Sequence, residues 1–157
     1  MKKVITLTMI VLLSVGVSAS AAVRELPTEI MGISLGMSRA DARTRLQSLG
    51  SLERETRKRQ EVWAIKDARI SHLLVGYDPD MRVRYVTAIA RNDGPRIRYD
   101  EVADVKSAER VQNQGNHKLT WQIAARSGQS AYALIAHGHH AQFLDSYSLK
   151  KVDQQQD

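Results

Sequence analysis

A glycine-bounded segment with the features of one capped helix, residues 32–50, most constrains how this chain can fold. Ser38 is a strong N-cap residue, and Asp41 three positions later completes a variant of the capping box. Apolar residues then recur at helical spacing on one face: Ala42, Leu46 and Leu49. Gly50 follows as the residue expected to end the helix. The pattern predicts an amphipathic helix over 39–49 that must pack against an apolar surface.

Most of the remaining chain alternates apolar and polar residues, as half-buried strands do. Three or four strands are predicted before the turn residues Asn92–Pro95, at 61–66, 70–77 and 81–91 and, as a possible first and polar strand, at 52–56. After that break, a second helix is predicted over 100–111 from the three-residue spacing of Val102, Val105 and Ala108, and then three strands at 117–125, 131–137 and 141–149. Trp63 and Trp121 fall on apolar strand faces and are predicted to be core residues.

These elements predict an α+β fold, with one or two helices packed on one face of an antiparallel meander sheet. The order of a helix followed by strands occurs twice, over 30–92 and 95–150, although no residue-level repeat accompanies it. We expect a single domain over 23–150, followed by a polar tail over 151–157. The tail should begin to fray near Lys150.

Residues 1–22 have the pattern of a secretory signal peptide. Lys2 and Lys3 precede an apolar run from Val4 to Val17, and small residues suited to cleavage follow it. The run is shorter than the roughly 20 residues that span a bilayer. We therefore expect export to the periplasm, with secretion beyond it as an open alternative.

The composition excludes several kinds of chemistry. The chain has no cysteine, which rules out disulfides, a thiol nucleophile and a thiolate metal site. No run of 18 apolar residues occurs later in the sequence, so no transmembrane segment is predicted. The formal charge of +6 falls to +4 without Lys2 and Lys3, and this excess favours anionic partners. Outside the cytoplasm we expect a protein or an anionic envelope component as partner, and no nucleic acid; the oligomeric state is not set by the sequence.

Two stretches carry a family resemblance. Gly32-Ile33-Ser34-Leu35-Gly36-Met37-Ser38, with the helix that follows, and Tyr77-Asp78-Pro79-Asp80-Met81-Arg82-Val83 resemble the small periplasmic BamE/SmpA-like domains of outer-membrane assembly lipoproteins. The β-lactamase-inhibitor proteins share that helix-then-antiparallel-sheet fold. The resemblance covers residues 30–90 and implies a binding or scaffolding module without catalytic residues. The lipobox cysteine of the lipoproteins is missing here, which removes the basis for a membrane anchor.

Two basic groups are candidates for binding a partner. The first comprises Arg54, Arg57, Lys58 and Arg59, interleaved with Glu53, Glu55 and Glu61. The second begins with Arg82 and Arg84, which share a strand face, and continues with Arg91, Arg96 and Arg98. A solvated hairpin is the ordinary interpretation of such charge runs. The functional interpretation, a contact for an anionic partner, gains if the two groups converge in space.

The segment His137-Gly138-His139-His140 supplies three imidazoles within four residues, and neutral imidazoles bind zinc, copper or nickel. The alternative is a polar turn that happens to be rich in histidine. His137, His139 and His140 are therefore candidate metal ligands, and a periplasmic metal-binding protein is the second functional hypothesis.

Motifs for catalysis are absent from the sequence. It contains no phosphate-binding loop, no dinucleotide fingerprint and no Gly-x-Ser-x-Gly elbow. The sequence therefore predicts a non-catalytic binding or scaffolding protein without a cofactor.

Overall fold

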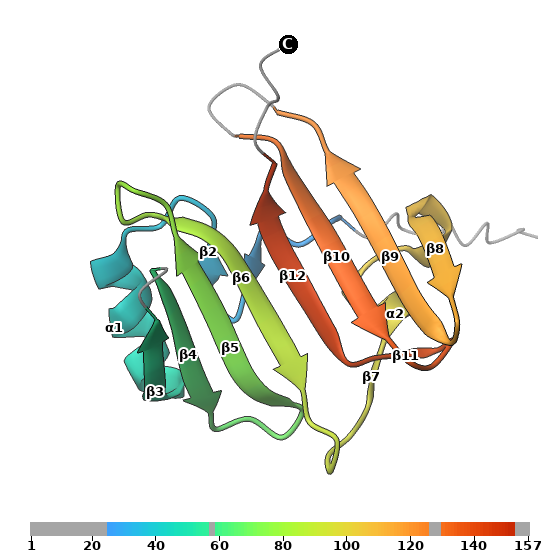
Figure 1. Ribbon diagram of the computed structural model, residues 1–157, viewed down its shortest axis with the longest axis horizontal. Helices are drawn as coiled ribbons and strands as arrows, with labels where there is room; N and C mark the ends of the chain where they lie inside the picture. Colours follow the sequence, from blue (N-terminus) through green and yellow to red (C-terminus); the bar gives the residue numbers. More distant parts are fainter. Residues whose placement is uncertain (1–24, 57–58, 126–129, 153–157) are drawn as a thin grey trace, which may run out of the picture.

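The computed structural model of this chain describes residues 25–56, 59–125 and 130–152. The predicted signal peptide over 1–22 and the end of the predicted tail lie outside these residues. The described chain forms one eight-stranded antiparallel sheet, in the strand order β3-β4-β5-β6-β12-β10-β9-β8, with helices packed on one face (Figure 1). The predicted α+β fold class is confirmed.

The two parts of the chain contribute four neighbouring strands each to this sheet. The first part supplies β3 (Gly50–Thr56), β4 (Gln60–Ile65), β5 (Ile70–Tyr77) and β6 (Val83–Ala90). The second supplies β8 (Glu109–Asn113), β9 (Asn116–Ile123), β10 (Tyr132–Gly138) and β12 (Ser146–Lys151). The last strand of the chain, β12, pairs with β6 at the centre of the sheet, so both parts share one continuous ladder (Figure 1).

The remaining strands of the described residues form two small two-stranded antiparallel sheets. β1 (Glu29–Ile30) pairs with β2 (Ile33–Ser34), and β7 (Ile97–Arg98) pairs with β11 (Phe143–Leu144). Both lie on the same side of the large sheet as the helices (Figure 1).

Helix α1 (Arg39–Leu49) has the predicted bounds. The Ser38 hydroxyl accepts a 3.1 Å hydrogen bond from the Asp41 amide, as the capping pattern predicts. Gly50 ends the helix, but in an extended rather than a left-handed conformation. A Cβ at Gly50 would lie 1.8 Å from the Ala64 carbonyl oxygen. Glycine is required there because β3 starts in close contact with β4.

The prediction of a second helix over 100–111 is wrong. The structure has one helical turn, α2 (Tyr99–Val102), then a 3₁₀ turn at Val105–Ser107, and then strand β8. Extended backbone at Ala103 interrupts the helix, and the Asp104 carbonyl accepts a 2.9 Å hydrogen bond from the Trp121 indole. Valines at 102, 105 and 111 are poor helix formers. The weak helical pattern therefore does not produce a helix, and residues 109–113 form strand β8, which pairs with β9.

The apolar core lies on one face of the sheet. Trp63 and Trp121 are both 2% exposed, as predicted, and Ala42 and Leu46 of α1 are fully buried against the same face. The other face is partly exposed; on it the Tyr85 ring lies over Gly76, where a Cβ would meet the ring at 2.0 Å. No helix among residues 25–56, 59–125 and 130–152 is long and apolar enough to cross a membrane.

Candidate functional site

The two predicted basic groups meet only in part at one end of the sheet. Arg54 and Arg59 of the first group lie there with Arg82 and Arg84 of the second. Arg91, Arg96 and Arg98 do not: Arg91 donates to the Asp67 and Ile65 carbonyls beyond the other end of β6, and Arg96 and Arg98 pair with Asp145 and Asp100.

The Tyr77 amide donates a 2.9 Å hydrogen bond to the Arg59 carbonyl, so the β3–β4 turn lies beside the β5–β6 turn (upper side of Figure 1). Arg82 ends the second turn, and Arg84 follows on β6. Arg54 lies on β3, opposite Val62, and is exposed. The predicted contact residues Arg57 and Lys58 lie outside the described residues.

Strand β12 adds two lysines that were predicted to lie in or beside a frayed tail. Lys150 pairs with Tyr85 of β6 and is exposed on the open face of the sheet. Lys151 pairs with Tyr132 of β10, and its side chain therefore projects from the opposite face. We define the cationic end by the basic residues at these turns and strand ends: Arg54, Arg59, Arg82, Arg84, Lys150 and Lys151.

The six basic residues of the cationic end outnumber the acidic residues among them, which are two in the turns and Glu53 and Glu55 on β3. Arg39 and Arg43 bind the Glu55 carboxylate. In the described parts of the two turns, the acidic side chains are Asp78 and Asp80. The Asp78 carboxylate accepts a 2.9 Å hydrogen bond from the Arg82 amide and thereby fixes the turn. Neighbouring strands lie about 4.8 Å apart, which is less than the Debye length of about 8 Å at physiological salt. The fields of basic side chains on adjacent strands therefore add, whereas Arg54 on β3 and Lys150 on β12 are four strands, about 19 Å, apart and are largely screened from each other.

A cavity of about 410 Å³ opens at the cationic end, on the core side of the sheet. Five short segments form its walls: the N-terminal lead-in, the turn after β2, the β5–β6 turn, the start of β10 and the end of β12. Arg82 and Lys151 supply its cationic groups, and Asp78 its carboxylate.

Of the three Glu residues of the first basic group, Glu53 and Glu55 are exposed on β3, whereas Glu61 is not solvated. The Glu61 side chain is fully buried, and its Oε1 atom accepts 2.8 Å bonds from the Nε atoms of both Arg39 and Arg43. Its Oε2 atom accepts 3.0 Å bonds from the Trp63 indole and the Tyr77 hydroxyl.

Glu55 completes this arrangement, which we call the Glu61 cluster. Its carboxylate binds the outer nitrogens of Arg39 and Arg43, and the Arg39 guanidinium lies 5.4 Å from the centre of the Tyr77 ring. The two arginines are spaced four residues apart on α1, so the cluster fastens the helix to β3 and β4.

The electrostatics of the cluster favour the ionised carboxylate. Burial alone would raise the pKa of Glu61, but hydrogen bonds from Trp63, Arg39, Arg43 and Tyr77 outweigh it, and the pKa is lowered. Burial, together with the Glu61 charge, raises the pKa of Tyr77 well above its ordinary value, so its hydroxyl stays a donor. Arg39 and Arg43 are thus occupied within the protein.

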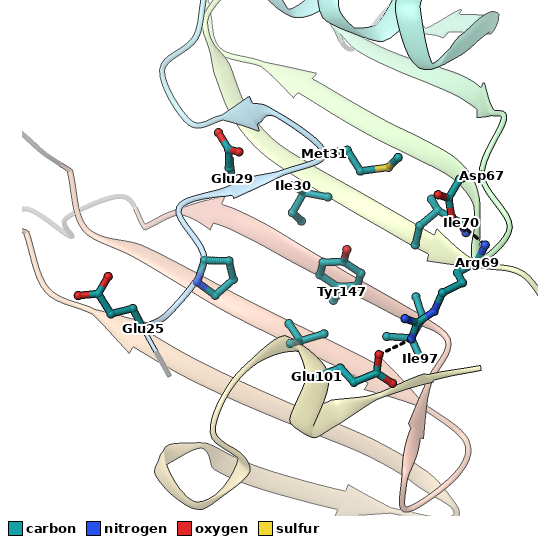
Figure 2. Close-up of a pocket in the computed structure, with 12 residues that line it drawn as sticks. Glu25, Glu29, Ile30, Met31, Asp67, Arg69, Ile70, Ile97, Glu101 and Tyr147 are labelled. Atoms are coloured by element: carbon teal, nitrogen blue, oxygen red, sulfur yellow. Dashed lines mark hydrogen bonds and ion pairs between the residues drawn. The ribbon is translucent and has the colours of Figure 1, made fainter. Parts of the chain in front are cut away.

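A second concavity, of about 420 Å³, lies between the N-terminal lead-in, α2 and the loop after β4 (Figure 2). Tyr147 forms its floor, and Arg69 extends from the loop to Glu101 of α2, with 2.6 Å between Nη2 and Oε2. Hydrogen bonds from the Arg98 amide and from Arg69 lower the pKa of Glu101. The Asp67 carboxylate accepts the amides of Arg69 and Ile70. The Arg69–Glu101 pair therefore joins the two parts of the chain, whereas Asp67 fixes the loop after β4.

The histidine segment is arranged differently from a metal site. His137 lies on β10, whereas His139 follows the end of that strand, and its Nδ1 lies 2.6 Å from Asp145 Oδ2. Burial and the nearby Lys118 lower the pKa of His137. Within the described part of the chain, no three His, Asp or Glu side chains are grouped so as to hold a metal ion. Metal binding by His137, His139 and His140 stays a prediction to which the geometry adds no support.

Comparison with known proteins supplies no relative: no protein-family model, no curated protein and no solved structure matches this chain. The described residues define an α+β fold with a group of basic residues at one end of its sheet. The resemblance to BamE/SmpA-like domains stays a prediction.

Proposed function

We propose that this protein is a non-catalytic binding or scaffolding module of the periplasm that contacts an anionic partner through its cationic end. The partner is an acidic protein surface or an anionic component of the envelope. The observation that carries the proposal is the convergence of basic residues from three separate chain segments at one end of the sheet. The expected signal peptide provides the periplasmic location.

Most of the basic side chains of the cationic end are exposed. Arg54, Arg59 and Lys150 are exposed, in contrast to Arg39 and Arg43, which hold buried Glu61. Arg59 also has a positive φ of 58°, a conformation that costs a non-glycine residue about 1 kcal/mol or more.

Charge reversal at matched positions tests the proposal. The first variant carries Arg54→Glu, Arg59→Glu and Lys150→Glu at the cationic end. The second carries Lys66→Glu, Arg110→Glu and Lys118→Glu, which are exposed and lie at or toward the opposite end of the sheet. Both variants change the net charge equally, so the comparison separates position from total charge.

Binding is measured by co-sedimentation with phosphatidylserine-containing and purely zwitterionic vesicles, and by titration with polyglutamate. Each basic residue near an anionic surface contributes about 1 kcal/mol, so the first variant should lose roughly 100-fold in affinity. The second should lose much less. Equal losses in the two variants, or wild-type protein that binds neither anionic vesicles nor polyglutamate, would contradict the proposal. The two probes distinguish a lipid-like partner from an acidic polypeptide.

A further inference from the structure

The cavity at the cationic end has walls that main-chain hydrogen bonds hold in place. The Gly36 amide donates to the Val83 carbonyl at 2.8 Å, and the Val83 amide donates to the Met37 carbonyl at 2.9 Å. On the other side, the Val152 amide donates to the Ala131 carbonyl at 3.0 Å. The cavity is therefore bounded by paired backbone on two sides.

The charged groups of the cavity suit an anion. Arg82 donates from Nη1 to the Gly36 carbonyl at 3.1 Å, which uses one of the five N–H donors of its guanidinium. Lys151 lines the cavity from β12. The Asp78 carboxylate also lines it, but accepts the Arg82 amide. Two cations and one hydrogen-bonded carboxylate leave a formal charge of +1 in the lining.

The other residues that line the cavity indicate which chemical group could accompany the anion. Leu35, Val83 and the Tyr132 ring supply apolar surface, and hydroxyl groups provide further hydrogen-bonding atoms, from Thr28, Ser34, Ser130 and Tyr132. A volume of about 410 Å³ falls within the range of roughly 300–1,000 Å³ that is typical of small-molecule sites. A bare inorganic ion would fill only part of it.

We propose that this cavity binds a small organic oxyanion, a carboxylate or phosphate monoester on a ring-sized apolar body, with the oxyanion between Arg82 and Lys151. The inference deepens the proposed function and rests on it for the preference for anions. It assigns to the cationic end a discrete ligand site in addition to an extended contact surface.

The test uses phenyl phosphate and benzoate as probes and benzyl alcohol as the neutral control, each titrated into the full-length mature protein. Amide chemical shifts are followed by NMR. Both anions, or one of them, should bind saturably at millimolar concentration or below and shift the amides of Gly36, Val83 and Tyr132. Benzyl alcohol should bind at least about tenfold more weakly, because it lacks the charge. The difference between the two anions identifies the preferred head group.

Lys151→Gln and Arg82→Gln should each lower the affinity for the preferred anion by about tenfold or more, as expected for loss of a charge-assisted hydrogen bond. Lys150→Gln is the matched control, since it removes the same charge one residue away on the opposite face of the sheet. Absence of saturable binding, or an equal effect of Lys150→Gln and Lys151→Gln, would overturn the inference. Lys151→Gln keeps the test valid if Arg82→Gln disturbs the turn.

The outcome is distinguishable from failure of the proposed function. The reversal variant of Arg54, Arg59 and Lys150 leaves every residue of the cavity lining unchanged. If vesicles and polyglutamate bind but the aryl anions do not, the pocket proposal alone fails. If the aryl anions bind saturably and the extended anionic probes do not, the surface contact fails and the pocket remains.

Discussion

The Glu61 cluster and the cationic end both draw residues from the charge run at 53–61, yet they have opposite properties. Glu55 and Glu61 face each other across β3 and β4 on the helix side of the sheet. Two like charges in that position would repel, but Arg39 and Arg43 each bind both carboxylates. Arg54 lies next to Glu55 and opposite Val62, so it points to the other face.

The difference teaches that strand alternation, and not local charge density, decides which charges become structural. Residues on the helix side are enclosed and find partners on α1, where desolvation makes a lost partner costly. Residues on the open side and in the turns stay hydrated, and their pairs contribute little to folding. The four predictions below separate a buried cluster that stabilises the fold from an exposed one that is available for binding.

The largest effect is expected for Glu61→Ala. The substitution leaves two arginines and the polar atoms of Trp63 and Tyr77 without their shared acceptor. The free energy of unfolding should fall by about 3–5 kcal/mol, as for other broken buried ion pairs. Urea denaturation measures it. Glu53→Ala, which removes an exposed carboxylate 3.2 Å from His72, should cost less than about 1 kcal/mol; similar costs for both would contradict the distinction.

The pH dependence of stability should come next in size. The folded-state pKa of Glu61 is lowered, so its contribution is complete above the ordinary glutamate pKa of about 4.3. It is lost as the pH falls through the lower, folded-state value. The urea midpoint of the wild type should therefore fall more steeply between about pH 5 and pH 3 than that of Glu61→Gln. Parallel curves would show that Glu61 is not the group responsible.

A smaller effect of opposite sign is expected for Arg59→Gly. Glycine adopts the positive φ of this position without the steric cost, which should stabilise the fold. The greater entropy of glycine in the unfolded chain offsets part of this gain. The variant should be more stable by about 0.5 kcal/mol while binding anionic vesicles more weakly. Thermal denaturation and co-sedimentation of the same preparation check both. A loss of stability would show that the Arg59 side chain supports the fold.

The smallest stability effect is expected for Lys150→Glu. Its side chain is exposed on the open face, so the free energy of unfolding should stay within about 0.5 kcal/mol of the wild type. Vesicle binding should nevertheless decrease. A destabilisation above about 1 kcal/mol would place Lys150 among the structural charges and remove it from the cationic end.

The elements that were predictable from the sequence depend on local signals. The Ser38 cap and the apolar spacing of Ala42 and Leu46 define α1, and alternation defines most strands. The burial of Glu61 was not predictable, because its partners Arg39 and Arg43 are 22 and 18 residues away and only the fold brings them together.

The cationic end was predicted in part. Arg54, Arg59, Arg82 and Arg84 were identified as candidates, but their convergence depends on the register of β3 to β6, which single-strand patterns do not specify. Lys150 and Lys151 were missed because a polar segment at the chain end carries no strand signal. Both lysines belong to β12 because they pair with β10, and Lys150 also pairs with β6.

Mapping the contact surface tests the central proposal most directly. Amide shifts of the protein without residues 1–22 are recorded with and without polyglutamate and, separately, with small phosphatidylserine-containing bicelles. We predict shifts that cluster at Arg59, at 82–85 and at 150–151, that disappear as salt is raised, and that spare the strand pair 109–118. Shifts centred on 109–118, or no salt-dependent shifts with either probe, would contradict the assignment of the cationic end as the binding surface.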